Sequence, residues 1–171
     1  EYLYENKTYN VDLSLSARNG GRNTDDQAIS GQDSISQGSA WLYESFATGT
    51  LDGYNYQTGT SAQRNARKDS GEKLQFALWY LEDEIKEENK TDYDIDNNIF
   101  LNLAQSHFGT TDFSILKQDY TGSRIGVMNL TDHNGSHIQD QVVLTAVPAP
   151  GALILGAIGV GLTAIKNRKR F

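Results

Sequence analysis

The 171-residue chain contains no cysteine. This excludes a disulfide framework and a thiolate metal site within these residues. Proline is nearly absent, because the only two prolines are Pro148 and Pro150, close to the C-terminus. Glycine, asparagine, serine, threonine and tyrosine are plentiful instead. This composition is common in secreted, β-rich surface proteins.

Basic residues are scarce in the body of the chain. Residues 151–171 hold four of the 15 bases and none of the 22 acids, so residues 1–150 carry 11 bases against 22 acids, a net charge of −11. A body this acidic repels the phosphate backbone of nucleic acids. We therefore expect no nucleic-acid partner.

The C-terminus combines a proline motif, a hydrophobic run and a basic end. An uncharged run extends from Ala152 to Ile165. A helix over 151–165 would be about 22 Å long at 1.5 Å per residue, which is shorter than a typical bilayer span. Snorkelling of the basic end could make up the difference. The proline motif is Val147, Pro148, Ala149 and Pro150, and the basic residues are Lys166, Arg168, Lys169 and Arg170.

This arrangement predicts a membrane anchor, with the basic end on the cytoplasmic side and the body outside. Two pairs of small residues, Ala152 with Gly156 and Ala157 with Gly161, would let such helices from different copies pack closely. The alternative is a hydrophobic C-terminal helix buried in a soluble domain.

The tail resembles the sorting signal of PEP-CTERM proteins, which are exported by bacteria. Their signal is a Val-Pro-Glu-Pro-like motif followed by a hydrophobic helix and a basic cluster. Val147, Pro148 and Pro150 fit the motif, and Ala149 stands where glutamate is commonest. The resemblance implies recognition by exosortase, a transpeptidase-like membrane enzyme, then transient membrane anchoring and transfer to the cell surface or extracellular matrix. Because export needs a signal peptide, we expect the sequence to begin inside a longer precursor.

Alternating and turn-forming residues predict strands at both ends of the body. The alternation Tyr9, Val11, Leu13, Leu15 predicts a strand or hairpin over residues 2–15, with a turn near residues 6–7. Residues 124–131 and 138–145 predict a second hairpin around Asn134-Gly135. We expect loops over 17–33 and 51–68.

Three helices are predicted between these strands. The first covers 34–48 and is closed by Gly49, and the third covers 97–107 before Gly109. The second begins at a capping box of Asp69 and Glu72, with the following acids facing water. Its apolar face is Leu74, Ala77, Leu78, Leu81 and Ile85.

The expected organisation is therefore a body and a tail. Residues 1–146 should form an extracellular β-rich domain with short helices, mainly β and either β-sandwich-like or α+β. Residues 147–171 should form the sorting motif, a C-terminal hydrophobic helix and the basic tail.

The body carries a second resemblance. Residues 74–79 resemble the apolar-Gln-x-x-apolar-Trp motif of bacterial surface thioester domains, in which the glutamine condenses with a cysteine thiol. Gln75 matches the acyl position, but the partner cysteine is not in this chain. The alternative is a helix glutamine hydrogen-bonded to a neighbouring loop.

The wider body is similar to PEP-CTERM proteins that share three segments. These are Ile-Ser-Gln-Gly-x-Ala-Trp-Leu-Tyr at 35–43, Gln-x-x-x-Trp-x-Leu-Glu at 75–82, and a Val-x-Asn-Leu … Gln-Asp-Gln-x-Val-Leu hairpin at 127–144. Members often carry a cysteine upstream of the position where this chain starts. A natural precursor could therefore supply the thiol.

Other chemistry-bearing residues have ordinary explanations. His133 and His137 flank Asn-Gly, which breaks helical ligand geometry, so we expect a solvated turn. Asp92, Asp94 and Asp96 lack the glycine and distal glutamate of a calcium loop, so we expect a charged loop. No catalytic triad can be specified. We expect no metal, no cofactor and no enzymatic activity.

These observations predict an exported structural protein of the cell surface or extracellular matrix, such as a biofilm matrix. The expected partners are further copies in a filament or layer, an exosortase-type enzyme, the membrane, and an extracellular polysaccharide. The tryptophans could provide a sugar-stacking surface, although on helices they are more often core. The alternatives are a thioester-type adhesin, which binds polysaccharide or protein, and a matrix-degrading enzyme with paired carboxylates.

Overall fold

The computed structural model describes residues 8–17, 33–136 and 140–145. Of these residues, 47% are helical and 18% lie in strands. The α+β class is therefore confirmed, whereas the expectation that strands dominate is wrong. The physical reason is a long helix whose first half has no apolar pattern. The expected C-terminal helix and the other predicted tail residues lie outside the described ranges.

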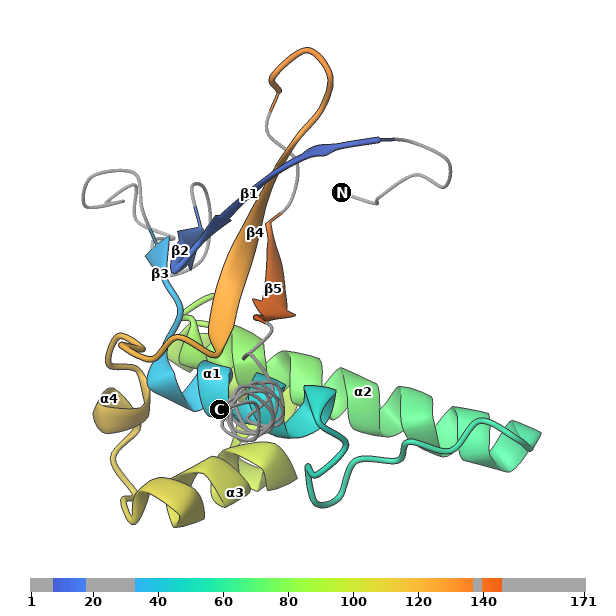
Figure 1. Cartoon of the computed structure of the whole chain (residues 1–171). Helices are drawn as coiled ribbons and strands as arrows, with labels where there is room; N and C mark the ends of the chain where they lie inside the picture. The colour runs from blue at the N-terminus through green and yellow to red at the C-terminus, as the bar shows by residue number, and fades with distance from the viewer. Residues whose placement is uncertain (1–7, 18–32, 137–139, 146–171) are drawn as a thin grey trace, which may run out of the picture.

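The main sheet has three antiparallel strands in the order β1-β4-β5. Strand β1 (Asn10–Ser14) pairs with β4 (Ile125–Thr131), and β5 (Gln141–Leu144) pairs with the other side of β4. In Figure 1 this sheet stands above the helices. The strand predicted from the alternation at the N-terminus and the hairpin predicted at the end of the body are both confirmed. The expected turn near residues 6–7 lies outside the described residues.

The connection after β4 starts with a hydrogen-bonded turn. Oδ1 of Asp132 accepts hydrogen bonds from the backbone N–H groups of Asn134, at 2.9 Å, and Ser136, at 2.8 Å. Gly135 has φ +81°, a left-handed conformation that glycine adopts without steric cost. The turn predicted at Asn134-Gly135 is confirmed, and the whole connection is longer than two residues.

A second sheet of two short strands lies beside the first. Strand β2 (Ser16–Ala17) pairs with β3 (Asp33–Ser34), so the ends of the loop predicted over 17–33 are strands. The buried amide of Asn129 on β4 donates a hydrogen bond to the Ser16 carbonyl at 3.1 Å. This bond ties the small sheet to the large one.

Helix α1 (Gln37–Ala47) lies between the main sheet and the other helices (Figure 1). Ser36 caps it, with its Oγ accepting from the Ser39 N–H at 3.1 Å. Ala40 packs with Ile35 and Ile125 against the sheet, and the other side of the helix enters the helical core. The predicted helix and its closing Gly49, at φ +76°, are confirmed.

Helix α2 (Ser61–Leu81) starts earlier than predicted. The capping box is formed by Thr60 and Gln63, whose side chains bond each other's backbone N–H groups at 3.2 and 2.8 Å. The predicted helix start at Asp69 is therefore wrong. The loop predicted over 51–68 is also wrong for its second half, because residues 61–68 belong to α2. The preceding segment runs back along the helix, and Arg67 donates to the Tyr56 carbonyl at 3.2 Å.

Helix α2 also ends at Leu81, because Asp83 adopts a left-handed conformation at φ +59°. Two 3-10 helices follow, η2 (Glu87–Tyr93) and η3 (Ile95–Asn97). Ile85 was predicted on the apolar face of the helix. It lies in the turn after the helix, and its side chain is buried there.

The last helices complete the core. Helix α3 (Ile99–Phe108) starts after an Asn98 cap. The helix predicted over 97–107 and its end at Gly109, at φ +63°, are confirmed. Helix α4 (Phe113–Leu116) follows, and β4 then begins close to α1, where Arg124 pairs with Glu44 at 2.5 Å. The largest fully buried side chains of the helical core are Leu42, Tyr80, Leu81, Ile95, Phe100, Leu101 and Leu116.

Candidate functional site

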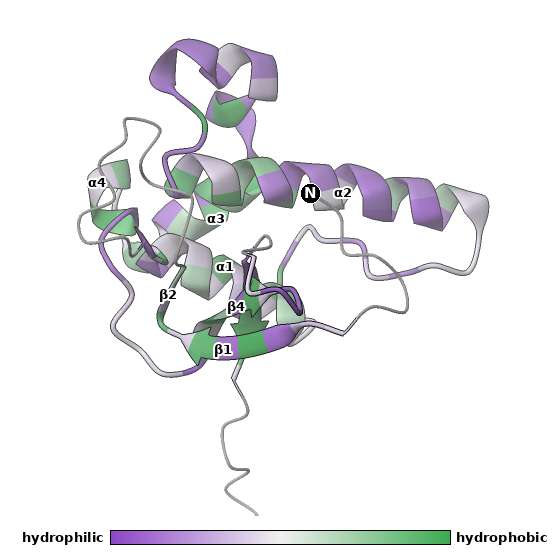
Figure 2. Ribbon diagram, turned by 90° about the horizontal axis from the view of Figure 1, so that it is seen from above, coloured by the Kyte–Doolittle hydropathy of each residue, from purple (hydrophilic) through white to green (hydrophobic). Residues whose placement is uncertain are grey.

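Strand β1 displays apolar side chains to solvent at the edge of the main sheet. Val11 and Leu13 are each 58% exposed, and Leu15, just beyond the strand, is 51% exposed. No described strand pairs with the outer edge of β1, which leaves β4 as its one neighbour within the described ranges. In Figure 2 the ribbon of β1 alternates between hydrophobic green and hydrophilic purple.

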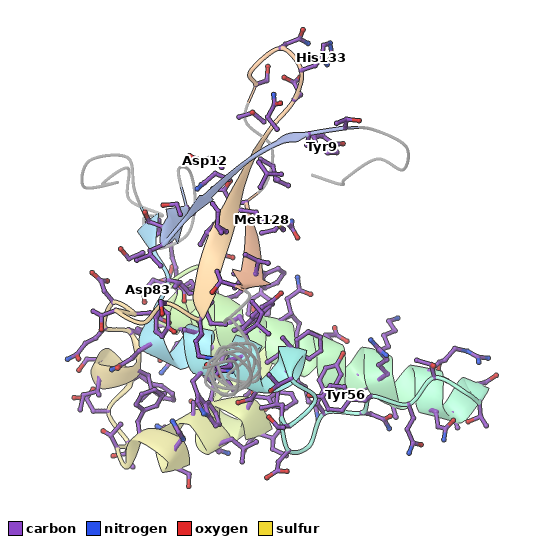
Figure 3. The ribbon with its side chains drawn as sticks, in the orientation of Figure 1. Tyr9, Asp12, Tyr56, Asp83, Met128 and His133 are labelled. Carbon is purple, nitrogen blue, oxygen red and sulfur yellow. The ribbon has the colours of Figure 1, made fainter. Side chains whose placement is uncertain are left out.

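These apolar side chains lie on the face of the sheet that is turned away from α1. Leu13 pairs directly with Met128 and so shares its face, whereas Ile125, which packs beneath α1, has the opposite parity. Leu13 also lies over Gly126, where an added Cβ would be 3.4 Å from the Leu13 Cδ1. Figure 3 labels Met128 on β4, between β1 and β5.

An edge strand of this kind can pair with another strand. Its outer backbone N–H and C=O groups form a template, and most soluble proteins protect such an edge with charge, proline or a covering element. In β1 the outward positions instead hold valine and leucine on one face. The arrangement is suited to strand addition, in which backbone hydrogen bonds and apolar contacts form together.

A partly buried carboxylate, that of Glu82, marks a second unusual position, where α2 ends beside the start of α1. Oε1 of Glu82 accepts a hydrogen bond from the Ser36 N–H at 3.1 Å and another from the Ser36 hydroxyl at 2.7 Å. Burial raises the pKa of Glu82, the nearby Ser39 hydroxyl and the two hydrogen bonds from Ser36 partly oppose that rise, and the Asp33 charge adds to it. The prediction that the acids after Leu81 all face water is therefore wrong for Glu82.

The Glu82–Ser36 contact joins two of the three segments that carry the resemblance of the body. Ser36 belongs to segment 35–43 and Glu82 to segment 75–82. Gly38 fits the same junction, since an added Cβ would lie 3.1 Å from the Leu116 carbonyl oxygen and from the Leu81 side chain. Because Ser36 donates both hydrogen bonds to one oxygen, the contact is suited to holding α1 against α2.

The predicted thioester position lies on the solvent side of α2. Gln75 is exposed, and within the described part of the chain its side chain makes no hydrogen bond to a loop. Trp79 is half-buried, with its ring centroid 5.9 Å from that of Phe76. The two motif residues thus differ, one facing solvent and one packing on the protein.

The candidate metal ligands among the described residues do not converge, and His137 lies outside those residues. Figure 3 shows His133 at the far tip of the hairpin, away from the helices. Asp94 accepts a hydrogen bond from the Asn97 amide at 2.8 Å and is exposed between η2 and η3. Asp92 and Asp96 lie in these 3-10 helices, so the charged loop predicted there is wrong. Among residues 8–17, 33–136 and 140–145, no three histidine or acidic side chains are grouped so that they could hold a metal ion.

Trp41 is part of a pocket that sequence reasoning did not identify. Its ring stacks on His107, with centroids 4.4 Å apart, and Asp52 lines the same pocket. These residues come from α1, the loop after it and α3. No local spacing links them, so the sequence offered no signal beyond the presence of a helix-borne tryptophan.

Comparisons with known proteins give no assignment. No protein-family model matches the chain, and searches of curated proteins and of solved structures find no match. Among the described helices, none has the length and apolar character that crossing a bilayer requires.

Proposed function

We propose that the protein is an exported structural protein of the bacterial cell surface or extracellular matrix, sorted through its C-terminal tail and assembling through β1. The observation that carries this proposal is the apolar edge strand on an otherwise acidic, polar domain. Exposed apolar residues grouped in this way mark a surface that another chain covers. The proline motif, hydrophobic run and basic end support export, and the proposal includes no catalytic role.

A second copy of β1 fits this edge in one favourable register. Antiparallel pairing centred on Leu13 sets that residue opposite itself, Val11 opposite Leu15, and Asp12 opposite Ser14. Every apolar side chain then meets another on the same face of the sheet. Centring the pair on Asp12 would instead oppose two like charges, which is destabilising. The expected dimer has the two-fold symmetry that is commonest in homo-oligomers.

A filament needs a second contact elsewhere on the subunit. The pairs Ala152–Gly156 and Ala157–Gly161 in the tail would supply one through close helix packing. Alternating strand contacts and tail contacts would then link subunits into an open chain. This explains how one small domain could build an extended surface structure.

The register predicts a disulfide. Directly opposed residues on antiparallel strands have Cα atoms about 4.5–5.5 Å apart, within the range that a disulfide spans. The Leu13→Cys variant should therefore form covalent dimers on mild oxidation, visible on a non-reducing gel. The 171 residues contain no cysteine that would interfere.

Matched cysteine variants test the same register. Val11→Cys alone should stay largely monomeric, whereas a mixture of Val11→Cys and Leu15→Cys should crosslink. Ile115→Cys serves as the control, because it is an exposed apolar position, 37% exposed, on another element. Crosslinking at Ile115→Cys equal to that at Leu13→Cys would argue for random collision and against the β1 interface.

Reversing the basic end tests export. Changing Lys166, Arg168, Lys169 and Arg170 to glutamate should abolish surface attachment, because the positive end fixes membrane orientation. Cell fractionation and surface labelling of the full precursor measure the effect. The same reversal at four basic residues of α2 and the turn after it, Arg64, Lys68, Lys73 and Lys86, should leave attachment unchanged. Normal attachment of the tail variant would contradict sorting through the tail.

A further inference from the structure

A pocket of about 220 Å³ opens between α1, α3 and the loop that follows α1. Figure 1 shows the two helices as neighbours, and they are in contact. Trp41 and His107 line one side of the pocket as a stacked pair, with ring centroids 4.4 Å apart and ring planes 14° from parallel. Leu51, which is 3% exposed, and Leu103 add aliphatic surface. The volume lies below the roughly 300–1,000 Å³ of pockets for drug-sized ligands, so a ligand with a single ring fits it best.

Polar side chains at the pocket are available for a ligand. Asp52 comes from the loop, Ser45 lies one turn after Trp41, and Ser106 precedes His107. None of the side chains of Asp52, Ser45 and Ser106 hydrogen-bonds or ion-pairs with another described residue. The carboxylate can accept two or more hydrogen bonds, and each hydroxyl can donate and accept.

The lining favours an uncharged ligand that has both an apolar face and several hydroxyl groups. A pyranose ring has C–H groups that pack on aromatic rings, and its adjacent hydroxyls can donate to one carboxylate. Among the described residues that line the pocket there is no lysine or arginine to pair with a phosphate or a uronic acid, and Asp52 adds a negative charge. The acidic body would also repel an anion.

We infer that this pocket binds one neutral pyranose unit of a polysaccharide. The Trp41–His107 pair packs against the sugar ring, and Asp52 accepts hydrogen bonds from neighbouring hydroxyls. Ser45 and Ser106 contact the remaining hydroxyls. The inference adds a matrix partner to the proposed surface protein. It is tested on purified protein, so its failure would be distinct from a failure of the export experiment.

The test is a fluorescence titration of the full chain carrying Trp79→Phe, which leaves Trp41 as the sole tryptophan. Glucose, mannose, galactose and N-acetylglucosamine are the probes. At least one should give a saturable change at millimolar concentration, with the same dissociation constant by calorimetry. Asp52→Ala should weaken that binding about tenfold, as expected when a hydrogen bond to a charged group is lost. Asp52→Asn should weaken it only a few-fold, because the amide oxygen still accepts.

Two controls keep the inference falsifiable. Asp92→Ala removes an exposed carboxylate elsewhere and should leave binding unchanged. Ser106→Phe fills the pocket from an exposed position and should abolish the response without changing urea stability. The inference is overturned if none of the four sugars gives a saturable response, or if Asp52→Ala or Ser106→Phe binds as tightly as the parent.

Discussion

Replacing Phe100 with alanine is expected to lower the free energy of unfolding by about 3–5 kcal/mol, the usual cost of removing an aromatic side chain from a core. Phe100 is 0% exposed and lies in the first turn of α3. Its ring centroid is 6.5 Å from that of Tyr54, within the cluster shared by α1, α2 and α3. Because three helices enclose the site, the cavity can collapse only partly. Urea unfolding followed by circular dichroism measures the loss.

Phe108 provides the matched control for this substitution. It lies at the last position of the same helix and is half-buried. Phe108→Ala should therefore cost roughly 1 kcal/mol, because the half-buried ring of Phe108 buries less apolar surface than the ring of Phe100. Equal losses at the two positions would show that the helical core is not the main source of stability.

Local signals were sufficient for the elements whose ends carry caps. Helix α3 lies between the Asn98 cap and Gly109, and both the helix and its glycine end were predicted. The hairpin of β4 and β5 follows from two apolar runs around Asn134-Gly135. In each case the turn chemistry and the apolar spacing indicated the same structure.

The start of α2 could not be predicted from apolar spacing, because its first turns lie on the outside of the domain. Residues 61–73 are almost entirely polar, so no stripe distinguishes them from a loop. The chain offers two capping boxes, Thr60–Gln63 and Asp69–Glu72, and the first is the one that forms. Only the second box, which is closer to the apolar face, was predicted, so the first turns of the helix were predicted as loop.

The candidate sites depend on tertiary contacts that no local pattern records. Alternation predicted the strand around Leu13, but its exposure follows from its position at the sheet edge. The pocket residues Trp41, Asp52 and His107 come from three separate segments. Similarly, the run of acids after Leu81 predicted a solvated surface, whereas the partner that buries Glu82 lies 46 positions earlier in the sequence.

Glu82→Ala is expected to lower the free energy of unfolding by about 2–4 kcal/mol. The substitution leaves the Ser36 N–H and hydroxyl without their acceptor, and a buried donor without a partner costs about 1–3 kcal/mol. Ser36 also caps α1, so the loss should appear in the packing of α1 on α2. Urea unfolding followed by fluorescence measures it, with Glu88→Ala, an exposed acid, as the control. A loss equal to that of Glu88→Ala would contradict the structural role.

Glu82→Gln separates the hydrogen bond from the charge. The amide oxygen can accept both bonds from Ser36, so the loss at neutral pH should be below about 1 kcal/mol. Burial raises the folded-state pKa of Glu82 above its ordinary value of 4.5. The stability that Glu82 contributes is therefore fully present below the ordinary pKa and is lost as the pH rises through the folded-state pKa. Glutamine does not titrate, and it also removes a charge that raises the pKa of Glu84. The free energy of unfolding of Glu82→Gln, relative to that of the unsubstituted chain, should therefore increase from about pH 4 to pH 7. A constant difference between the two free energies across that range would show that folding does not perturb the Glu82 carboxylate.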